Sequence, residues 1–286
     1  MSTVCMFPGQ GSQAKGMGAA LFDRYPDWTA EADAVLGYSI RELCVEDPRG
    51  ELGLTRFTQP AMFVVNALTY RARQDDGRAA PDFVAGHSLG EYNALVAARV
   101  FDFATGVRLV NRRAQIMSQV SGGGMAAIIG LDPPAIEAVL AKSDAGRRLD
   151  VANFNSFDQT VIAGPREDLD AVKADVEAAG ARAYIPLNVS APFHSRYMQE
   201  AQAQFARALD GVTFGLPAMP VIANATGRPY DPAQARDTLA RQIGSSVRWL
   251  DAMLYALNAG ATEFEEVGPG TVLGKILQQI RRRMKK

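Results

Sequence analysis

Apolar residues in the first 120 positions alternate between short continuous runs and longer stretches with helical spacing. A short apolar run bounded by turn residues is typical of a buried strand, whereas apolar positions that repeat every three to four residues predict a helix. The strands expected on this basis are 4–7 and 82–85, and the helices are 16–25, 58–73, 89–99 and 103–120. A strand followed by a glycine turn and a helix indicates α/β organisation.

The stretch from 125 to 187 has a different pattern, with two helical segments set among short apolar strands. The expected strands are 125–131, 149–155, 159–164 and 181–187, and the expected helices are 133–143 and 166–180. This β-α-β-β-α-β order is that of a ferredoxin-like unit. Glycine-rich 121–124 marks the entry to the unit, and 188–194 marks its exit.

The rest of the chain returns to the mixed pattern of the first part. The expected elements are a helix at 196–210, a strand at 220–224, helices at 232–243 and 247–259, a strand at 263–267 and a last helix from 271. We therefore predict an α/β protein with a large domain, residues 1–123 and 189–286, and a small ferredoxin-like subdomain inserted at 124–188.

Composition excludes several classes of function. The formal net charge of −1 disfavours a nucleic-acid partner, which needs a clustered basic face. The N-terminus lacks a charged segment followed by a long apolar one, and no stretch approaches the roughly 18 apolar residues of a membrane span. Cys5 and Cys44 form no Cys-x-x-Cys pair, so we expect two reduced thiols without a nucleophilic role. These features predict a cytoplasmic protein that does not act on membranes.

Basic residues gather at the end of the chain, at Arg281, Arg282, Arg283, Lys285 and Lys286. Cations suit the last turn of a helix, because the helix dipole is negative there. The alternative is a surface that docks an acidic partner. Both interpretations remain open at this point.

The segment Gly86-His87-Ser88-Leu89-Gly90 fits the pattern Gly-x-Ser-x-Gly, with a predicted strand before it and a predicted helix after it. A serine on such a sharp strand-to-helix turn exposes its hydroxyl as a nucleophile. The helix N-terminus and the Leu89 amide then face the oxyanion that forms on a bound carbonyl. The alternative is an ordinary turn in which serine caps the helix.

A nucleophilic serine needs a base, and the chain has two histidines, His87 and His194. His87 adjoins Ser88, so on a sharp turn its side chain should project elsewhere, in a structural or hydrogen-bonding role. His194 lies where the small subdomain returns to the large one, which is a place where clefts form. By elimination we predict His194 as the general base. No acidic residue between Ser88 and His194 in the sequence stands out as the third member of a catalytic triad. We therefore expect a backbone carbonyl to orient the imidazole of His194.

The glycine-rich loop at 7–14 contains Gly9-x-Gly11-x-x-Ala14 after a strand, which resembles a dinucleotide fingerprint superficially. Pro8 interrupts the turn, no suitably placed acidic residue follows, and the Lys-Ser/Thr of a P-loop is absent. A more consistent role is a turn that presents the Gln10 amide as a second oxyanion donor beside Leu89.

Arg113 lies on the helical face of Leu109, Ile116 and Met117, which is predicted to be buried. A buried arginine needs an anionic partner, because an unpaired buried charge is costly. That partner is either an internal carboxylate or the carboxylate of a substrate held by both guanidinium nitrogens. Spacing alone does not decide between the two.

Taken together, these segments closely resemble the malonyl-CoA:acyl-carrier-protein transacylases of fatty-acid or polyketide synthesis. The resemblance covers nearly the whole chain, and its motifs are FPGQGSQ (7–13), GHSLGEY (86–92), RRAQIM (112–117), NFNS (153–156), APFHS (191–195) and EVGPGTVL (266–273). It implies a hydrolase-like α/β core with a ferredoxin-like insert.

The resemblance also implies roles for individual residues. Ser88 corresponds to the serine that carries the malonyl ester, His194 to its base, and Arg113 to the arginine that pairs with the malonyl carboxylate. The remaining implied residues are the backbone amides of Gln10 and Leu89 in the oxyanion hole, the backbone carbonyl of Gln242 that orients the histidine, and Asn155, Met117 and Phe193 in the substrate pocket. Phenylalanine before the histidine implies malonyl rather than branched extender units. Pro192 departs from the Gly-Ala that many relatives have at this place.

The implied reaction moves a malonyl group from malonyl-CoA to Ser88, and then to the phosphopantetheine thiol of an acyl carrier protein, either free or a domain of a polyketide synthase. No metal and no permanently bound cofactor are expected, and we expect a monomer. The main alternative is an acyl hydrolase that releases acyl groups from carrier proteins. A non-enzymatic docking protein is the third.

Overall fold

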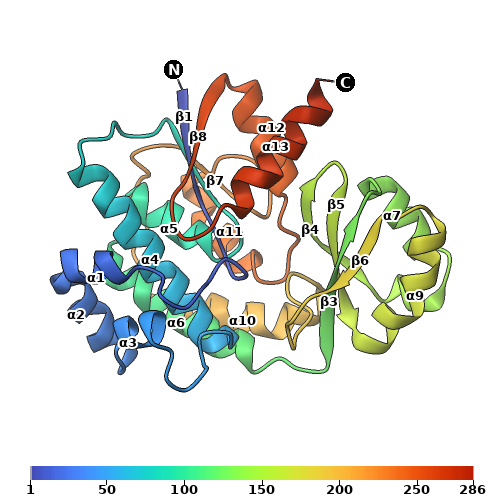
Figure 1. Cartoon of the computed structure of the whole chain (residues 1–286), viewed down its shortest axis with the longest axis horizontal. Coiled ribbons are helices and arrows are strands. Elements are labelled where there is room, and N and C mark those ends of the chain that lie inside the picture. Colours follow the sequence, from blue (N-terminus) through green and yellow to red (C-terminus); the bar gives the residue numbers. More distant parts are fainter. Residues whose placement is uncertain (1, 286) are drawn as a thin grey trace.

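The computed structural model describes residues 2–285, which fold around two separate four-stranded sheets (Figure 1). The first sheet is parallel, with the order β7-β2-β1-β8. Its strands are β1 (Ser2–Phe7), β2 (Phe83–Gly86), β7 (Val221–Ile222) and β8 (Ala261–Glu266). Phe7 is opposite Gly86 at the carboxyl ends of β1 and β2, so the loops that follow these two strands lie side by side at one edge.

Helices cover both faces of the parallel sheet. They include α4 (Thr55–Asp75), α5 (Gly90–Ala97), α6 (Phe103–Ser118), α12 (Trp249–Asn258) and α13 (Val272–Met284). Val4 and Met6 pack into a cluster with residues of α12 and α13, whereas Cys5 and Phe7 pack into the larger core with α4, α5 and α6. Because side chains alternate along a strand and both faces are buried, β1 reads as a continuous apolar run.

The second sheet is antiparallel, with the order β4-β5-β3-β6. Its elements are β3 (Gly123–Ile129), α7 (Pro133–Leu140), α8 (Asp144–Arg147), β4 (Asp150–Ser156), β5 (Gln159–Pro165), α9 (Arg166–Ala178) and β6 (Ala183–Pro186). Ile128 and Ile162 pack against Ile136 of α7 and Val172 of α9 in a core of their own. The predicted β-α-β-β-α-β order is confirmed, with α8 as an additional short helix. The domain limits at 124 and 188 stay a prediction.

Two helix predictions were wrong at their starts. The helix expected over 16–25 begins only at Ala19, because Gly16 and Gly18 have left-handed φ values of 90° and 74°. The helix expected over 58–73 begins at Thr55, so Pro60 lies farther inside it than expected. Proline is commonest at the first helical position, but burial of nearly every residue from 58 to 68 holds this segment helical against the core.

Two helices that the sequence analysis did not predict are α2 (Pro26–Leu36) and α3 (Ile40–Val45). The remaining elements follow the predicted order, with different limits. They are the 3₁₀ helix η1 (Arg196–Met198), α10 (Gln199–Ala208), the 3₁₀ helix η2 (Pro232–Gln234) and α11 (Ala235–Arg241). The strand expected at 220–224 is reduced to two residues, Val221 and Ile222. Among residues 2–285, no helix is both long enough and apolar enough to cross a bilayer.

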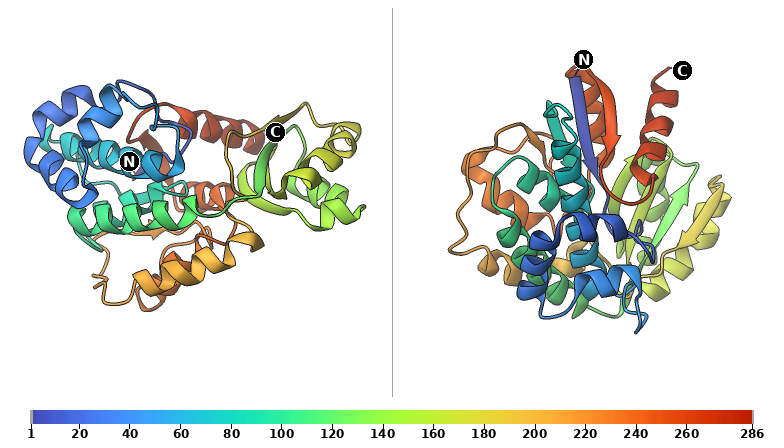
Figure 2. Two further views of the ribbon diagram at one scale, coloured as in Figure 1. Left: turned by 90° about the horizontal axis from the view of Figure 1, so that it is seen from below. Right: turned by 60° about the vertical axis from the view of Figure 1, so that its left-hand side comes forward.

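Backbone hydrogen bonds join the two bodies of the structure, the large one around the parallel sheet and the small one around the antiparallel sheet. Val247, from the large body, donates to Ala152 O at 2.8 Å and accepts from Phe154 N at 2.9 Å, so residue 247 extends the small sheet beside β4. The C-terminal helix α13 lies at the same junction, and it contacts both β8 and β4 (Figures 1 and 2).

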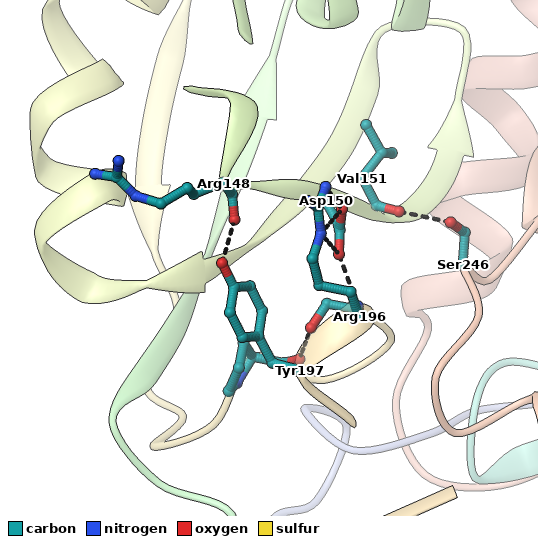
Figure 3. Close-up of polar contacts among 8 residues, drawn as sticks. Arg148, Asp150, Val151, Arg196, Tyr197 and Ser246 are labelled. Carbon is teal, nitrogen blue, oxygen red and sulfur yellow. Dashed lines mark hydrogen bonds and ion pairs between the residues drawn. The ribbon is translucent and has the colours of Figure 1, made fainter. Parts of the chain in front are cut away.

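Side chains reinforce this junction close to His194. Asp150 of β4 accepts from Arg196 N at 2.7 Å and from Arg196 Nε at 2.9 Å (Figure 3). Tyr197 donates its hydroxyl to Arg148 O at 2.7 Å, and Ser246 donates its hydroxyl to Val151 O at 2.6 Å. The start of β4 therefore holds both the segment that follows His194 and the segment before Val247.

Candidate active site

Ser88 occupies a strained turn between β2 and α5. Its φ of 50° is left-handed, which is uncommon for a residue with a side chain. A Cβ on Gly86 would lie 1.9 Å from the carbonyl carbon of Gly90, and a Cβ on Gly90 would lie 2.1 Å from Phe7 O. Glycine is therefore required on both sides of the turn, as the Gly-x-Ser-x-Gly pattern predicts.

Asn224, which follows β7, fastens this turn. Its Oδ1 accepts from Ser88 N at 2.6 Å, and its Nδ2 donates to Gly86 O at 2.6 Å. The strained backbone thus has hydrogen-bond partners on both sides of the nucleophile, which is how a local outlier is kept in place. No pattern in the sequence pointed to Asn224, since a lone asparagine after a strand is a common turn residue.

Ser88 and His194 meet although 106 residues separate them. Ser88 Oγ lies 2.8 Å from His194 Nε2. His194 Nδ1 lies 2.9 Å from the carbonyl oxygen of Gln242 and 3.2 Å from that of Ser245. Because both partners of Nδ1 can only accept, Nδ1 carries the proton and Nε2 is free to accept the serine proton. The predicted carbonyl of Gln242 is at the imidazole, and the second acceptor, Ser245, was not predicted.

Burial keeps the imidazole of His194 neutral. His194 is 4% exposed, and this burial, together with the positive charge of Arg113, lowers its pKa to about 3. A neutral imidazole is the form that acts as a base, so His194 is ready to take a proton at neutral pH.

The two predicted oxyanion residues are Gln10, in the loop after β1, and Leu89, which directly follows Ser88. Both residues line the cavity that contains Ser88, and within residues 2–285 neither amide donates a hydrogen bond. A Cβ on Gly9 would lie 2.5 Å from His87 O, so the 7–14 loop packs tightly on the serine turn. The next helix begins only at Ala19, which removes the helix N-terminus that a dinucleotide site needs.

Arg113 has no ionic partner among residues 2–285. It is 1% exposed, and its Nη1 donates to Gln59 Oε1 at 2.7 Å. Its Nη2 donates to Gln242 Oε1 at 3.0 Å and to Ser88 Oγ at 3.2 Å, whereas its Nε has no partner. Burial lowers its pKa, yet an arginine stays charged in proteins. The site therefore holds a positive charge that neutral amides satisfy only in part.

Ser88, His194 and Arg113 line one cavity of about 110 Å³. The other lining residues are Gln10, Gln59, His87, Leu89, Met117, Met125, Asn153, Leu187, Val189 and Phe193. Phe193 and Met117 thus lie where the sequence places pocket residues. A small acyl group with an anionic end fits the chemistry of this lining, which combines apolar and neutral polar side chains with the cation of Arg113.

Asn155, which the sequence analysis places in the substrate pocket, is not among the residues that line the cavity; Asn153 lines it instead. Asn155 lies two residues farther along β4, with its Oδ1 2.8 Å from His87 Nε2. The ring of His87 also lies 5.5 Å from that of Trp249. His87 therefore has the hydrogen-bonding role expected of it, and Asn155 is its partner.

The two cysteines lie outside this cavity. Cys5 and Cys44 are both buried, and burial raises the pKa of each thiol to about 12. Neither thiol is therefore ionised at neutral pH, and a thiolate is the nucleophilic form.

The basic end of the chain is described up to Lys285, and Lys286 lies outside the described residues. Arg281 donates to Thr262 O at 2.9 Å and covers the ring of Phe264, so it serves the fold. Arg282 and Arg283 line a surface hollow shared with Arg182 and Asp158. A role of this hollow in docking an acidic partner stays a prediction.

Known proteins are similar to this chain in sequence. A family model described as acyl transferase domain matches residues 4–285. The polyketide biosynthesis protein ThaF of Burkholderia thailandensis is 51% identical over 96% of this chain, which spans only 24% of ThaF. PksC of Bacillus subtilis, a polyketide biosynthesis malonyl CoA-acyl carrier protein transacylase, is 46% identical and is covered over 96% of its length by 97% of this chain.

Solved structures of malonyl-transacylases have the same fold as this chain. A malonyl CoA-acyl carrier protein transacylase from Burkholderia pseudomallei superposes with a TM-score of 0.95, at 50% identity over 99% of both chains. PlMCAT, a malonyl-transacylase in complex with the type II PKS acyl-carrier protein AntF, superposes with a TM-score of 0.94, at 37% identity over 99% of this chain and 94% of that one. The chain therefore belongs to the acyl transferase domain family, among the malonyl CoA-acyl carrier protein transacylases.

Proposed function

We propose that the protein transfers malonyl groups from malonyl-CoA to the phosphopantetheine thiol of an acyl carrier protein, through an ester on Ser88. The observation that carries this proposal is Arg113, a buried cation without an ionic partner in residues 2–285, which shares a small cavity with the Ser88–His194 pair. An anionic end of the substrate would complete the coordination of Arg113.

In the first half-reaction His194 Nε2 removes the proton from Ser88 Oγ, which attacks the thioester carbon of malonyl-CoA. The carbonyl oxygen becomes an oxyanion that the amides of Gln10 and Leu89 stabilise. The C–S bond then breaks, and the CoA sulfur leaves with the proton that His194 returns. Arg113 holds the malonyl carboxylate throughout.

The second half-reaction reverses these steps with another thiol. His194 takes the proton of the phosphopantetheine thiol, the sulfur attacks the seryl ester, and Ser88 leaves with the proton. One acyl group and one proton move in each half-reaction, so the sequence balances without a redox cofactor or a metal. We propose that a monomer performs it.

The partner carrier is inferred from the relatives. PlMCAT is a malonyl-transacylase in complex with an acyl-carrier protein, and PksC is named for transfer to one. ThaF and PksC are both named for polyketide biosynthesis, which favours a polyketide carrier for this chain over a fatty-acid carrier.

The acyl hydrolase alternative uses the same serine and histidine, but it has no use for a buried cation beside the nucleophile. In a hydrolase for uncharged acyl chains, no substrate group would offset the desolvation penalty of the buried Arg113. The geometry therefore favours a carboxylated acyl group over an uncharged one, and the names of the relatives favour transfer over hydrolysis.

The proposal is tested by mass spectrometry of the intact protein after mixing with malonyl-CoA. We expect the wild type to gain the mass of one malonyl group and to lose it when a holo carrier protein is added. Ser88→Ala should gain nothing, because the accepting oxygen is missing. Loss of the label to water at the same rate with and without carrier would contradict transfer and support hydrolysis.

Phe193 should set the size of the acyl group. It is 6% exposed, lines the cavity and directly precedes His194, so its ring fills space beside the bound malonyl group. We expect Phe193→Ser to shift the preference toward methylmalonyl-CoA by about 10-fold or more, since one methyl group in a pocket is worth roughly 10–200-fold. Competition between the two CoA esters measures this ratio, and an unchanged ratio would remove Phe193 as the determinant.

A further inference from the structure

Glu91 is a buried carboxylate for which the proposed reaction has no step. It is the second residue of α5, three positions after Ser88, and it is 0% exposed. Burial raises its pKa to about 7, although hydrogen bonds to the carboxylate act in the opposite direction. Burying a carboxylate is unfavourable because the charge loses its hydration, so a buried carboxylate needs hydrogen-bond donors around it.

Every polar neighbour of the Glu91 carboxylate donates to it. Oε1 accepts from the hydroxyl of Tyr230 and from Asn224 N, the latter at 3.3 Å. Oε2 accepts from Gln242 Nε2 at 2.7 Å. A carboxylate satisfies donors at both oxygens, whereas an amide in the same place would turn N–H groups toward N–H groups at one end. The site is thus built for an ionised Glu91.

Glu91 fixes the orientation of the Gln242 side chain. The two hydrogens of Gln242 Nε2 are used by Glu91 Oε2 and by Ser88 O, each at 2.7 Å. Gln242 Oε1 must then face the other way, where it accepts from Arg113 Nη2 at 3.0 Å. The carboxylate therefore reaches the guanidinium through a single oriented amide.

From this chain of contacts we propose that Glu91 is a positioning residue that holds the Arg113 guanidinium, through the side chain of Gln242, in the orientation that binds the substrate carboxylate. This inference rests on the proposed function. It assigns to Glu91 a role in specificity for carboxylated acyl groups rather than a role in proton transfer.

The first test is Glu91→Gln, which keeps the size of the side chain and removes its charge. We expect kcat for malonyl-CoA to fall by about 10- to 100-fold, since small misplacements in an active site cost this much. KM for malonyl-CoA should rise as well, because a misplaced Arg113 guanidinium binds the malonyl carboxylate less tightly even though its charge is kept. Labelling by malonyl-CoA should still reach one group per molecule, only more slowly, which shows that the variant is folded.

A double-mutant cycle separates positioning from simple structural support. With Arg113→Ala in place, Glu91→Gln should have little further effect, because the residue through which it acts is gone. Acetyl-CoA, which lacks the carboxylate, should also be affected less than malonyl-CoA. The matched control is Glu200→Gln, at an exposed position of α10, and this variant should behave as the wild type does.

The pH profile gives a second readout. The groups that face Glu91 are Tyr92 on its own helix, Tyr230, and Arg113 from α6; the two tyrosines have raised pKa values and Arg113 remains a cation. Near neutrality, Glu91 is thus the group of this set that changes charge. We expect kcat for malonyl transfer in the wild type to fall as the pH drops below about 7, and this decline should be missing in Glu91→Gln.

Two results would overturn the inference. One is a Glu91→Gln protein with wild-type kcat and pH profile on malonyl-CoA. The other is a loss of equal size on acetyl-CoA and in the Arg113→Ala background. Failure of the proposed function is distinct, because the wild type itself would then form no malonyl ester.

Discussion

Replacing His194 with alanine is expected to lower the rate of Ser88 acylation by on the order of 10⁴- to 10⁶-fold, the range seen when one member of a nucleophile–base pair is removed. Its Nε2 lies 2.8 Å from Ser88 Oγ, and its Nδ1 faces two backbone carbonyls, so no neighbouring side chain in residues 2–285 is placed to take over the proton. Single-turnover labelling with malonyl-CoA, followed by mass spectrometry, measures this rate.

The control for this experiment is His87→Gln. His87 lies beside the nucleophile in sequence, but its Nε2 is engaged with Asn155 Oδ1, a contact that a glutamine amide can keep. We expect this variant to stay within about tenfold of the wild type, as for residues outside the proton-transfer step. A fall of less than tenfold in His194→Ala, with the fold intact by circular dichroism, would show that another group is the base.

Replacing Arg113 with alanine is expected to lower kcat/KM for malonyl-CoA by about 30- to 4,000-fold, which corresponds to the roughly 2–5 kcal/mol lost with a buried charged contact. Acetyl-CoA has no carboxylate to lose, so the preference for malonyl over acetyl should collapse. Removing a buried cation that has no ionic partner within residues 2–285 also relieves a desolvation cost, so the variant should remain folded.

Arg112→Ala provides the matched control. Arg112 is the exposed neighbour of Arg113 on α6, and its loss should leave kcat/KM unchanged for both malonyl-CoA and acetyl-CoA. Thermal unfolding of both variants shows whether a change in activity follows from a change in stability. An Arg113→Ala protein that still prefers malonyl-CoA as the wild type does would remove Arg113 as the carboxylate clamp.

The sequence predicted the chemical centre more closely than its surroundings. Ser88 lies in a local motif, and His194 could be paired with it because the chain has two histidines and the other one adjoins Ser88. Arg113 was placed on a buried face by helical periodicity, which is local information. Its neighbours Gln59 and Gln242 are 54 and 129 positions away, so spacing could not show whether an acid was among them.

Asn224 and Glu91 were missed for the same physical reason. Their roles depend on contacts between residues far apart in the sequence, such as Asn224 to Ser88 over 136 positions, and the periodicity of a helix or a strand does not reveal such contacts. In the fold, the small subdomain was predicted well because its strands and helices are short and regular. The first helices were not, since Gly18 and Pro26 set their limits through local backbone geometry.

The junction at β4 has a consequence for engineering. Val247 binds β4 through backbone atoms, so a transplanted small subdomain from a relative could pair there whatever side chains it carries. The Asp150–Arg196 contact, in contrast, depends on the side chain of Asp150, which accepts from both the backbone N and Nε of Arg196, and Arg196 follows His194 by two positions. A chimera that replaces residue 150 with one that cannot accept hydrogen bonds would therefore lose a contact that holds the segment directly after His194.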